Sequence, residues 1–171
     1  GQSASFTGSG TDPDGTTPLT FFWDFGGGAA NQTVQNPGAV VFSTPGIYTV
    51  TFTVTDALGL SDPTPDTRVI TVNANQAPNG TIDTPADPVT IVSGQSVTFS
   101  GTGTDPDGTL PLAFLWHFQG GASDQTAEDP GAVVFSVPGT YTVMFTVTDA
   151  RGLSDPTPDS RVITVTNRPP T

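Results

Sequence analysis

Two pairs of aspartates are the residues of this chain best suited to chemistry, because each pair is separated by one residue inside a sharp turn. The segment DPDG at residues 12–15 recurs at residues 105–108. Such a turn lets the carboxylates of Asp12 and Asp14, or of Asp105 and Asp107, converge on one point. Ca²⁺ binds about six to eight oxygens from carboxylates and backbone carbonyls. The spacing therefore indicates a candidate calcium site in each copy.

The same segment also fits a purely structural turn. Proline at the second place and glycine at the fourth are typical of a type I turn. DPDG further lacks the longer run of ligands found in an EF-hand loop. Both interpretations stay open on the sequence alone.

Net charge narrows the range of partners. Asp and Glu outnumber Lys and Arg by sixteen to four, which gives a formal net charge of −12. Nucleic acids and anionic membranes require clustered basic residues, so the composition argues against both as partners. The apolar runs are also too short for membrane insertion. With no cysteine and one histidine, His117, the chain offers neither a Cys-based site nor a catalytic triad, and no residue is assigned a catalytic role.

An internal repeat sets the organisation that must position these residues. Residues 1–73 return as residues 94–166 at a constant offset of 93, and 53 of the 73 aligned pairs are identical. Repetition of this kind means two copies of one small domain. A duplicated module usually supplies length, spacing or valency. The repeat therefore favours a structural or binding role over an enzymatic one.

Alternating residues predict the fold class. Residues 48–55 (YTVTFTVT) and 141–148 (YTVMFTVT) alternate strictly, which is typical of a half-buried strand. No helical pattern appears. The sequence therefore predicts an all-β chain of two tandem Ig-like β-sandwich domains. Further strands are expected in the second copy near residues 79–84, 89–92, 95–101, 112–118, 131–136 and 160–166.

The expected domains are residues 1–73 and 79–166, with a linker at 74–78 and the start of a further linker at 167–171. Residues 75–93 should supply the first strand of the second copy, and no equivalent precedes Gly1. The chain thus looks like part of a longer tandem array, or like one whose missing edge strand comes from another chain. An unpaired edge would be a site for strand addition.

Three segments together resemble the PKD (polycystic kidney disease) domain family. FFWDFGG at residues 21–27 is similar to that family's W-D-F-G-D-G segment, and GIYTVTFTVTD at residues 46–56 is similar to its G-x-Y-x-V-x-L-x-V-x-D segment. The third feature is the DPDG turn ahead of the Trp strand. The second copy departs with WHFQG at residues 116–120, and neither copy keeps the acidic residue of the G-D-G loop.

The resemblance implies a set of calcium ligands. In calcium-binding PKD-like domains the ligands are a linker Asn, the D-x-D-G pair and the aspartate of a T-D pair. For the second copy this implies Asn75, the Gln76 carbonyl, Asp105, Asp107 and Asp149. The first copy keeps Asp12, Asp14 and Asp56 but lacks the linker ligands, so a weaker or empty site is expected there.

Aromatic residues suggest a second kind of surface. Trp23 and Trp116 could form a sugar-stacking platform, but each alternates with Phe on one face, as core residues of a sandwich do. The opposite, outward face carries the apolar side chains Phe22, Leu115, Met144 and Val162. This face is either a contact surface or a scatter of tolerated hydrophobic residues.

The sequence therefore predicts an extracellular spacer from a tandem PKD-like array, such as part of a surface filament or sheath, with calcium-stiffened linkers. Its partners would be neighbouring PKD-like repeats or identical chains. The alternative is an adhesive or substrate-targeting module of an adhesin or secreted hydrolase that binds polysaccharide or protein. Export is expected, with any signal outside this fragment.

Overall fold

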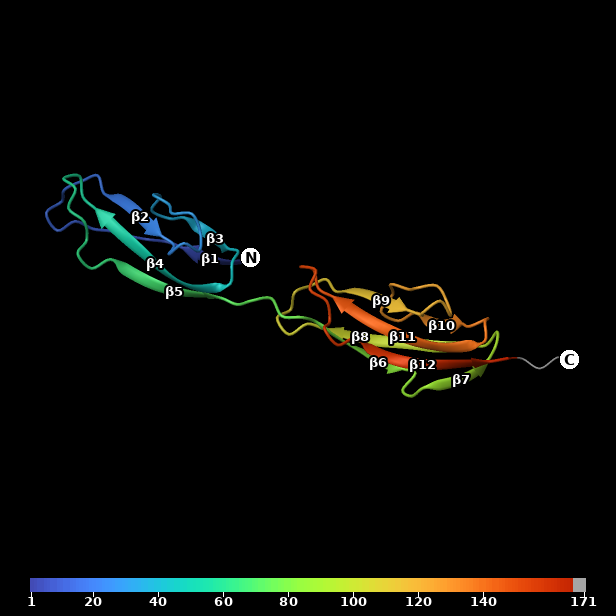
Figure 1. Ribbon diagram of the computed structural model, residues 1–171. Helices are drawn as coiled ribbons and strands as arrows, with labels where there is room; N and C mark the ends of the chain where they lie inside the picture. The colour runs from blue at the N-terminus through green and yellow to red at the C-terminus, as the bar shows by residue number, and fades with distance from the viewer. Residues whose placement is uncertain (168–171) are drawn as a thin grey trace. The chain divides into compact units, whose positions relative to one another are not determined.

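Two units make up the chain, and the computed structural model describes residues 1–167. Unit 1 is Gly1–Ala74 and unit 2 is Asn75–Thr171. All regular secondary structure in the described residues is β-strand (Figure 1). A search of that part of the chain finds no helix with the length and apolarity needed to cross a membrane.

Unit 2 is a sandwich of two sheets. One sheet has the order β10-β8-β6 and the other the order β7-β12-β11-β9. Neighbouring strands are antiparallel except β7, which runs parallel to β12. The strands are β6 (Asn79–Thr84), β7 (Val89–Val92), β8 (Ser96–Thr104), β9 (Ala113–His117), β10 (Gly131–Val134), β11 (Gly139–Thr148) and β12 (Asp159–Thr166).

The core of unit 2 lies between its sheets, because every second side chain of a strand points to the same face. In β11, Val143, Phe145 and Val147 are fully buried, whereas Met144 is exposed. Trp116 from β9 packs against Phe145 with ring centroids 4.4 Å apart. The alternation of residues 141–148 thus becomes one buried and one exposed face of β11.

Unit 1 contains five strands in two sheets, with the orders β1-β3 and β2-β4-β5. Its core repeats that of unit 2. The ring centroids of Trp23 and Phe52 are 4.3 Å apart, and this pair corresponds to Trp116 and Phe145. The strands are β1 (Gln2–Phe6), β2 (Thr20–Asp24), β3 (Gly38–Phe42), β4 (Gly46–Thr55) and β5 (Asp66–Val72).

Corresponding strands of the two units differ most at β1 and β8. β8 runs over nine residues and pairs with β10 on one side and β6 on the other. β1 has five residues and pairs only with β3. Residues 7–11, the counterparts of Ser100–Thr104, are not a strand in unit 1. The strand stops where its second partner is missing, because unpaired backbone forms no ladder.

The expected fold class is confirmed. The chain is all-β, with two tandem Ig-like sandwiches, and all seven strands expected in the second copy are present within a few residues of their predicted bounds. The tail interpreted as the start of a further linker (167–171) lies outside the described residues apart from Asn167.

Candidate metal centre

The DPDG turn of unit 2 forms the base of the candidate site. Gly108 adopts φ = 72°, a left-handed conformation that glycine accepts without strain. Oδ1 of Asp105 accepts the backbone N–H groups of Asp107 and Thr109, both at 3.0 Å. Asp107 in turn accepts the Thr109 hydroxyl at 2.6 Å. The aspartates therefore shape the turn, as the structural interpretation expects, and still leave carboxylate oxygens for other partners.

Asp149 approaches from the end of β11. Its Oδ1 accepts the N–H groups of Arg151 at 2.8 Å and Leu153 at 2.9 Å, which closes a tight loop between β11 and β12. The residue is only 4% exposed. Its second carboxylate oxygen, Oδ2, accepts the side-chain amide of Asn75.

The start of unit 2 joins these two loops. Asn75 bonds to Asp149, and its Oδ1 accepts the Thr109 hydroxyl at 2.9 Å. The backbone N–H of Gln76 donates to Oδ2 of Asp107 at 2.7 Å. Four of the five residues expected in this site are therefore linked directly or through Thr109, and Asp105 lies in the same turn.

One oxygen at this site has no partner. Within residues 1–167, Oδ2 of Asp105 is buried and accepts no hydrogen bond. A buried acceptor without a donor is unfavourable. This oxygen is the one that a hard, oxygen-binding cation would satisfy.

Two features limit that fit. Within residues 1–167, no three His, Cys, Asp or Glu side chains gather closely enough to hold a metal by themselves. Arg151 also donates to Oδ1 of Asn75 at 3.2 Å and brings a positive charge to the rim. Calcium here would have to use the amide oxygen of Asn75 and backbone carbonyls as well as carboxylates, and would compete with Arg151.

Hydrogen bonds lower the pKa of two carboxyl groups of the site, those of Asp107 and Asp149. Hydrogen bonds from the Thr109 hydroxyl and the Gln76 N–H lower the pKa of Asp107 to about 2. Burial acts to raise the pKa of Asp149, but the bonds from Asn75 and from the N–H groups of its loop outweigh burial and lower the pKa below its ordinary value. The site therefore concentrates negative charge beside the first residues of unit 2.

Unit 1 repeats the two loops without the linker. Asp12 accepts the N–H groups of Asp14 and Gly15, both at 2.9 Å, and Asp56 accepts that of Leu60 at 2.8 Å. The positions equivalent to Asn75 and Gln76 would lie before Gly1.

The tryptophans belong to the core. Trp23 is 5% exposed and Trp116 is 0% exposed. Neither can stack on a sugar from solvent, so the platform interpretation of these residues is wrong.

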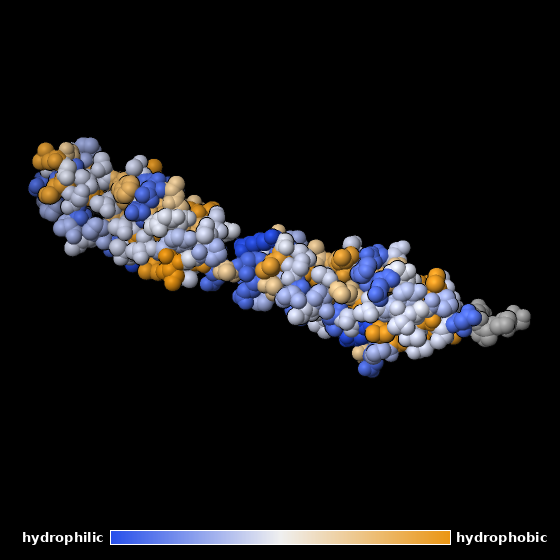
Figure 2. Space-filling model, viewed as in Figure 1, coloured by the Kyte–Doolittle hydropathy of each residue, from blue (hydrophilic) through white to orange (hydrophobic). Residues whose placement is uncertain are grey.

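The outward apolar residues lie where the alternation places them. Phe22 is 44% exposed, and Leu115, Met144 and Val162 are 37–43% exposed. Met144 lies opposite His117, two residues from Leu115, so both apolar side chains share one face of the sheet. In the view of Figure 2, hydrophobic residues form separate spots among polar ones.

Sequence reasoning missed three residues that hold a strand. Asp155, Asp159 and Arg161 bond to the backbone of the segment that contains β6. Their counterparts are Asp62 and Asp66, which lie in the longest stretch of identity between the copies (59–66), and Arg68, which follows one differing residue later. That identity was the available signal, but it does not reveal a contact across 75 residues.

Comparison with known proteins adds to this geometry. A family model described as "PKD domain" matches residues 1–72 and again residues 75–165. The fibronectin(III)-like modules of Clostridium thermocellum CbhA are 15% identical, with a TM-score of 0.45 over 97% of this chain and 95% of theirs. Three N-terminal domains of the outer capsid protein Hoc of bacteriophage RB49 are 18% identical, with a TM-score of 0.47 over 96% of this chain and 57% of that one.

A third similar structure contains carbohydrate-binding modules of the β-sandwich superfamily. It is 33% identical over 56% of this chain and 36% of its own length, with a TM-score of 0.43. The chain therefore spans little more than a third of that protein.

Proposed function

Because the chain belongs to the PKD domain family, with one match in each unit, we propose that it is an extracellular spacer module of a tandem array, such as a surface filament or sheath. Domains of this family are generally non-catalytic, and no residue here is given a catalytic role. Neighbouring repeats or identical chains are the partners that such an array needs.

The observation that carries the proposal is the attachment of the linker to unit 2. Asn75 and Gln76 bond to Asp149 and Asp107, which lie in two different loops of the sandwich. These bonds hold the first two residues of unit 2 against its own loops, and a joint stiffened in this way is what we propose. Stiff joints are what a spacer requires, because flexible ones let an array collapse.

Calcium is the finer part of the proposal. Bound at this site, the ion would supply a charge that neutralises the carboxylates and satisfies Oδ2 of Asp105. Asn75, the Gln76 carbonyl, Asp105, Asp107 and Asp149 would hold it. Asp12, Asp14 and Asp56 would be the corresponding ligands in unit 1.

A thermal melt of the whole chain tests calcium. Trp23→Phe leaves Trp116 as the only tryptophan, so its fluorescence reports on unit 2 alone. We expect millimolar calcium to raise the unfolding midpoint above that in chelator, and Asp105→Ala with Asp107→Ala to remove the gain. The matched control, Asp12→Ala with Asp14→Ala, should keep it. Coincident melts in calcium and chelator would reject the ion and leave the spacer role to hydrogen bonds alone.

Stiffening has its own test. The chain has no cysteine, so Thr67→Cys and Ser160→Cys would be its only thiols, one spin label in each unit. A joint held by Asn75 predicts a narrow distribution of label distances, which widens in Asn75→Ala. If the label distances are equally broad in the labelled chain and in its Asn75→Ala variant, the spacer proposal is contradicted.

A binding module is the second candidate, and the exposed apolar side chains of β9 and β11 favour it. Leu115 and Met144 are 43% and 39% exposed on one face, where unit 1 has Phe22 and Thr51. Retention of the chain on insoluble polysaccharide or collagen, lost in Leu115→Lys with Met144→Lys, would support this role. No retention on any of them counts against it.

A further inference from the structure

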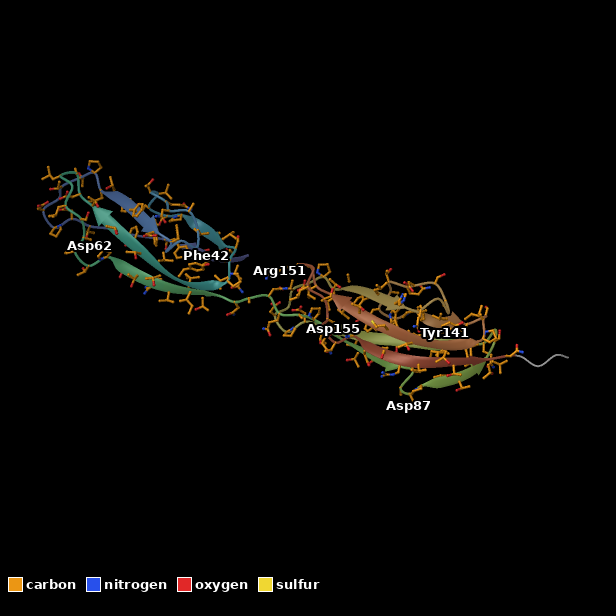
Figure 3. The ribbon with its side chains drawn as sticks, viewed as in Figure 1. Phe42, Asp62, Asp87, Tyr141, Arg151 and Asp155 are labelled. Carbon is orange, nitrogen blue, oxygen red and sulfur yellow. The ribbon has the colours of Figure 1, made fainter. Side chains whose placement is uncertain are left out.

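Arg151 is the cationic side chain that reaches the candidate metal centre in the described part of unit 2. Its guanidinium Nη1 donates to Oδ1 of Asn75 at 3.2 Å. The other arginine described in this unit, Arg161, bonds instead to the carbonyls of Ile82 and Pro85. Figure 3 labels Arg151 at the end of unit 2 where the chain enters this unit. A positive charge therefore already lies at the rim of the site.

The loop that carries Arg151 is anchored at its start. The backbone N–H of Arg151 donates to Oδ1 of Asp149 at 2.8 Å, and Asp149 is only 4% exposed. Oδ2 of the same carboxylate accepts the side-chain amide of Asn75. Arg151 and Asp149 therefore bond to each other through the backbone, and both bond to Asn75 through their side chains.

Unit 1 builds the same loop without the charge. Oδ1 of Asp56 accepts the N–H of Leu58 at 2.9 Å, as Oδ1 of Asp149 accepts that of Arg151. Leu58 is the counterpart of Arg151 at the offset of 93, and its side chain is 85% exposed. The loop therefore forms equally well with leucine, so the arginine of unit 2 is not needed to shape it.

The oxygen that Arg151 contacts has no free position for a cation. Oδ1 of Asn75 accepts the Thr109 hydroxyl at 2.9 Å as well as the guanidinium. A carbonyl oxygen has two lone pairs, and both are engaged here. A metal ion can bind this oxygen only if one donor leaves. The guanidinium is the donor that an ion repels, because the two carry charge of the same sign.

Charge gives Arg151 a second effect on the site. The aspartates Asp105, Asp107 and Asp149 together with Arg151 sum to a formal charge of −2, and the arginine offsets one of their three negative charges. Repulsion between like charges weakens the binding of a divalent cation. In the absence of an ion, the same guanidinium reduces the mutual repulsion of the aspartates.

We propose that Arg151 is the resident counter-ion of this site and sets its affinity for calcium. In the ion-free chain the guanidinium occupies Oδ1 of Asn75 and offsets part of the aspartate charge. Calcium binds by displacing it from Asn75. The inference rests on the calcium site of the proposed function and adds to it a residue that is not a ligand but determines how much calcium fills the site.

Arg151→Leu tests the inference on the whole chain, because it gives the loop the residue that unit 1 has at this place. Thermal melts at increasing calcium, followed by Trp116 fluorescence in the Trp23→Phe background, report on unit 2. We expect Arg151→Leu to need about tenfold less calcium than the parent chain for the same rise in the unfolding midpoint. In chelator the sign reverses. There the variant should melt below the parent chain, and sodium chloride should reduce this difference by screening the aspartates.

Two further variants separate charge from occupancy of Asn75. Arg151→Gln keeps a donor for Asn75 but removes the charge, so its calcium requirement should lie between those of the parent chain and Arg151→Leu. Arg68→Leu is the matched control, because it removes the same charge from unit 1. The calcium response of unit 2 should be unchanged in this control.

The outcomes distinguish this inference from the calcium proposal itself. An equal or weaker calcium response in Arg151→Leu, or a midpoint in chelator that is not lowered, overturns the inference and leaves the calcium proposal standing. A response in Arg151→Leu where the parent chain shows none supports the inference and rejects calcium binding by the parent chain. If neither chain responds to calcium, the inference and the calcium proposal are both rejected.

Discussion

At the scale of single residues, the two oxygens of an aspartate perform different tasks in this protein. Oδ1 of Asp105 and of Asp149 accepts N–H groups of its own loop, which is how Asx-turns are stabilised. Oδ2 of Asp149 reaches Asn75, and Oδ2 of Asp105 has no partner. The turn interpretation and the ligand interpretation therefore concern different atoms and are compatible.

Asp105→Asn separates these roles. In calcium-free buffer we expect the unfolding midpoint of unit 2 to rise, because an uncompensated buried acceptor is removed. About 1 kcal/mol corresponds to roughly 4 °C or more in a domain of this size. Calcium should not raise the unfolding midpoint of this variant further. Trp116 fluorescence in the Trp23→Phe background measures both, with Asp12→Asn as control. A variant that still responds to calcium would contradict a ligand role for Asp105.

Asp159 should make unit 2 sensitive to acid. Burial acts to raise its pKa, but the N–H groups of Ile82 and Ser160 and the guanidinium of Arg161 lower it below 3.8. A lowered pKa in the folded state contributes stability above the unfolded value, and this stability is lost as pH falls through the folded value. As the pH is lowered past about 3.8, the free energy of unfolding of unit 2 should therefore decrease.

Urea melts across pH 2–6 (about the range where carboxylates titrate) measure this loss. Asp159→Asn should reduce the loss of unfolding free energy that unit 2 shows at low pH. Asp66 holds no strand in unit 1, so Asp66→Asn should leave that loss unchanged. If the unfolding free energy of Asp159→Asn falls equally steeply with decreasing pH, other carboxylates cause the loss.

At the scale of elements, β6 and β7 are the two strands of unit 2 that have no counterpart in unit 1, and β6 carries a core residue. Ile82 is its deepest residue, at 2% exposed. We expect Ile82→Ala to destabilise unit 2 by about 2–5 kcal/mol, because a buried side chain leaves a cavity. Val162→Ala, on the exposed face of the same unit, should cost little. Chemical denaturation followed by Trp116 fluorescence measures both, and equal effects would indicate that β6 adds little to the core.

The edge left open in unit 1 should be visible by hydrogen exchange. Amides of Ser100–Thr104 belong to a ladder between β8 and β6, whereas those of residues 7–11 have no strand opposite them. We expect slow exchange in the first segment and fast exchange in the second. Slow exchange in residues 7–11 would contradict this difference between the two units.

At the scale of the whole molecule, two copies of one sequence should differ in stability. The core of unit 2 has twelve buried side chains and that of unit 1 has eight. Less buried apolar area gives less stabilisation. We therefore expect unit 1 to unfold first on heating, which the loss of amide signals of each unit in NMR spectra can follow. A unit 1 that melts later than unit 2 would contradict this account.

The sequence by itself determined the fold class, the repeat and the family. Period-two alternation is local, so residues 141–148 predict the buried and exposed faces of β11 without knowledge of its neighbours. The core role of Trp116 was predictable for the same reason. The DPDG turns could also be predicted from the sequence, because Pro and Gly impose their backbone angles within four residues.

Only the tertiary structure decided which distant groups the side-chain oxygens contact. Asn75 reaches Asp149 across 74 residues, and Asp155 reaches Gly80 across 75. No local pattern encodes such contacts, because they depend on how two sheets stack and on which strand edge remains unpaired. The resemblance indicated the ligand set, but the unpartnered oxygen of Asp105 and the competing Arg151 follow from packing alone.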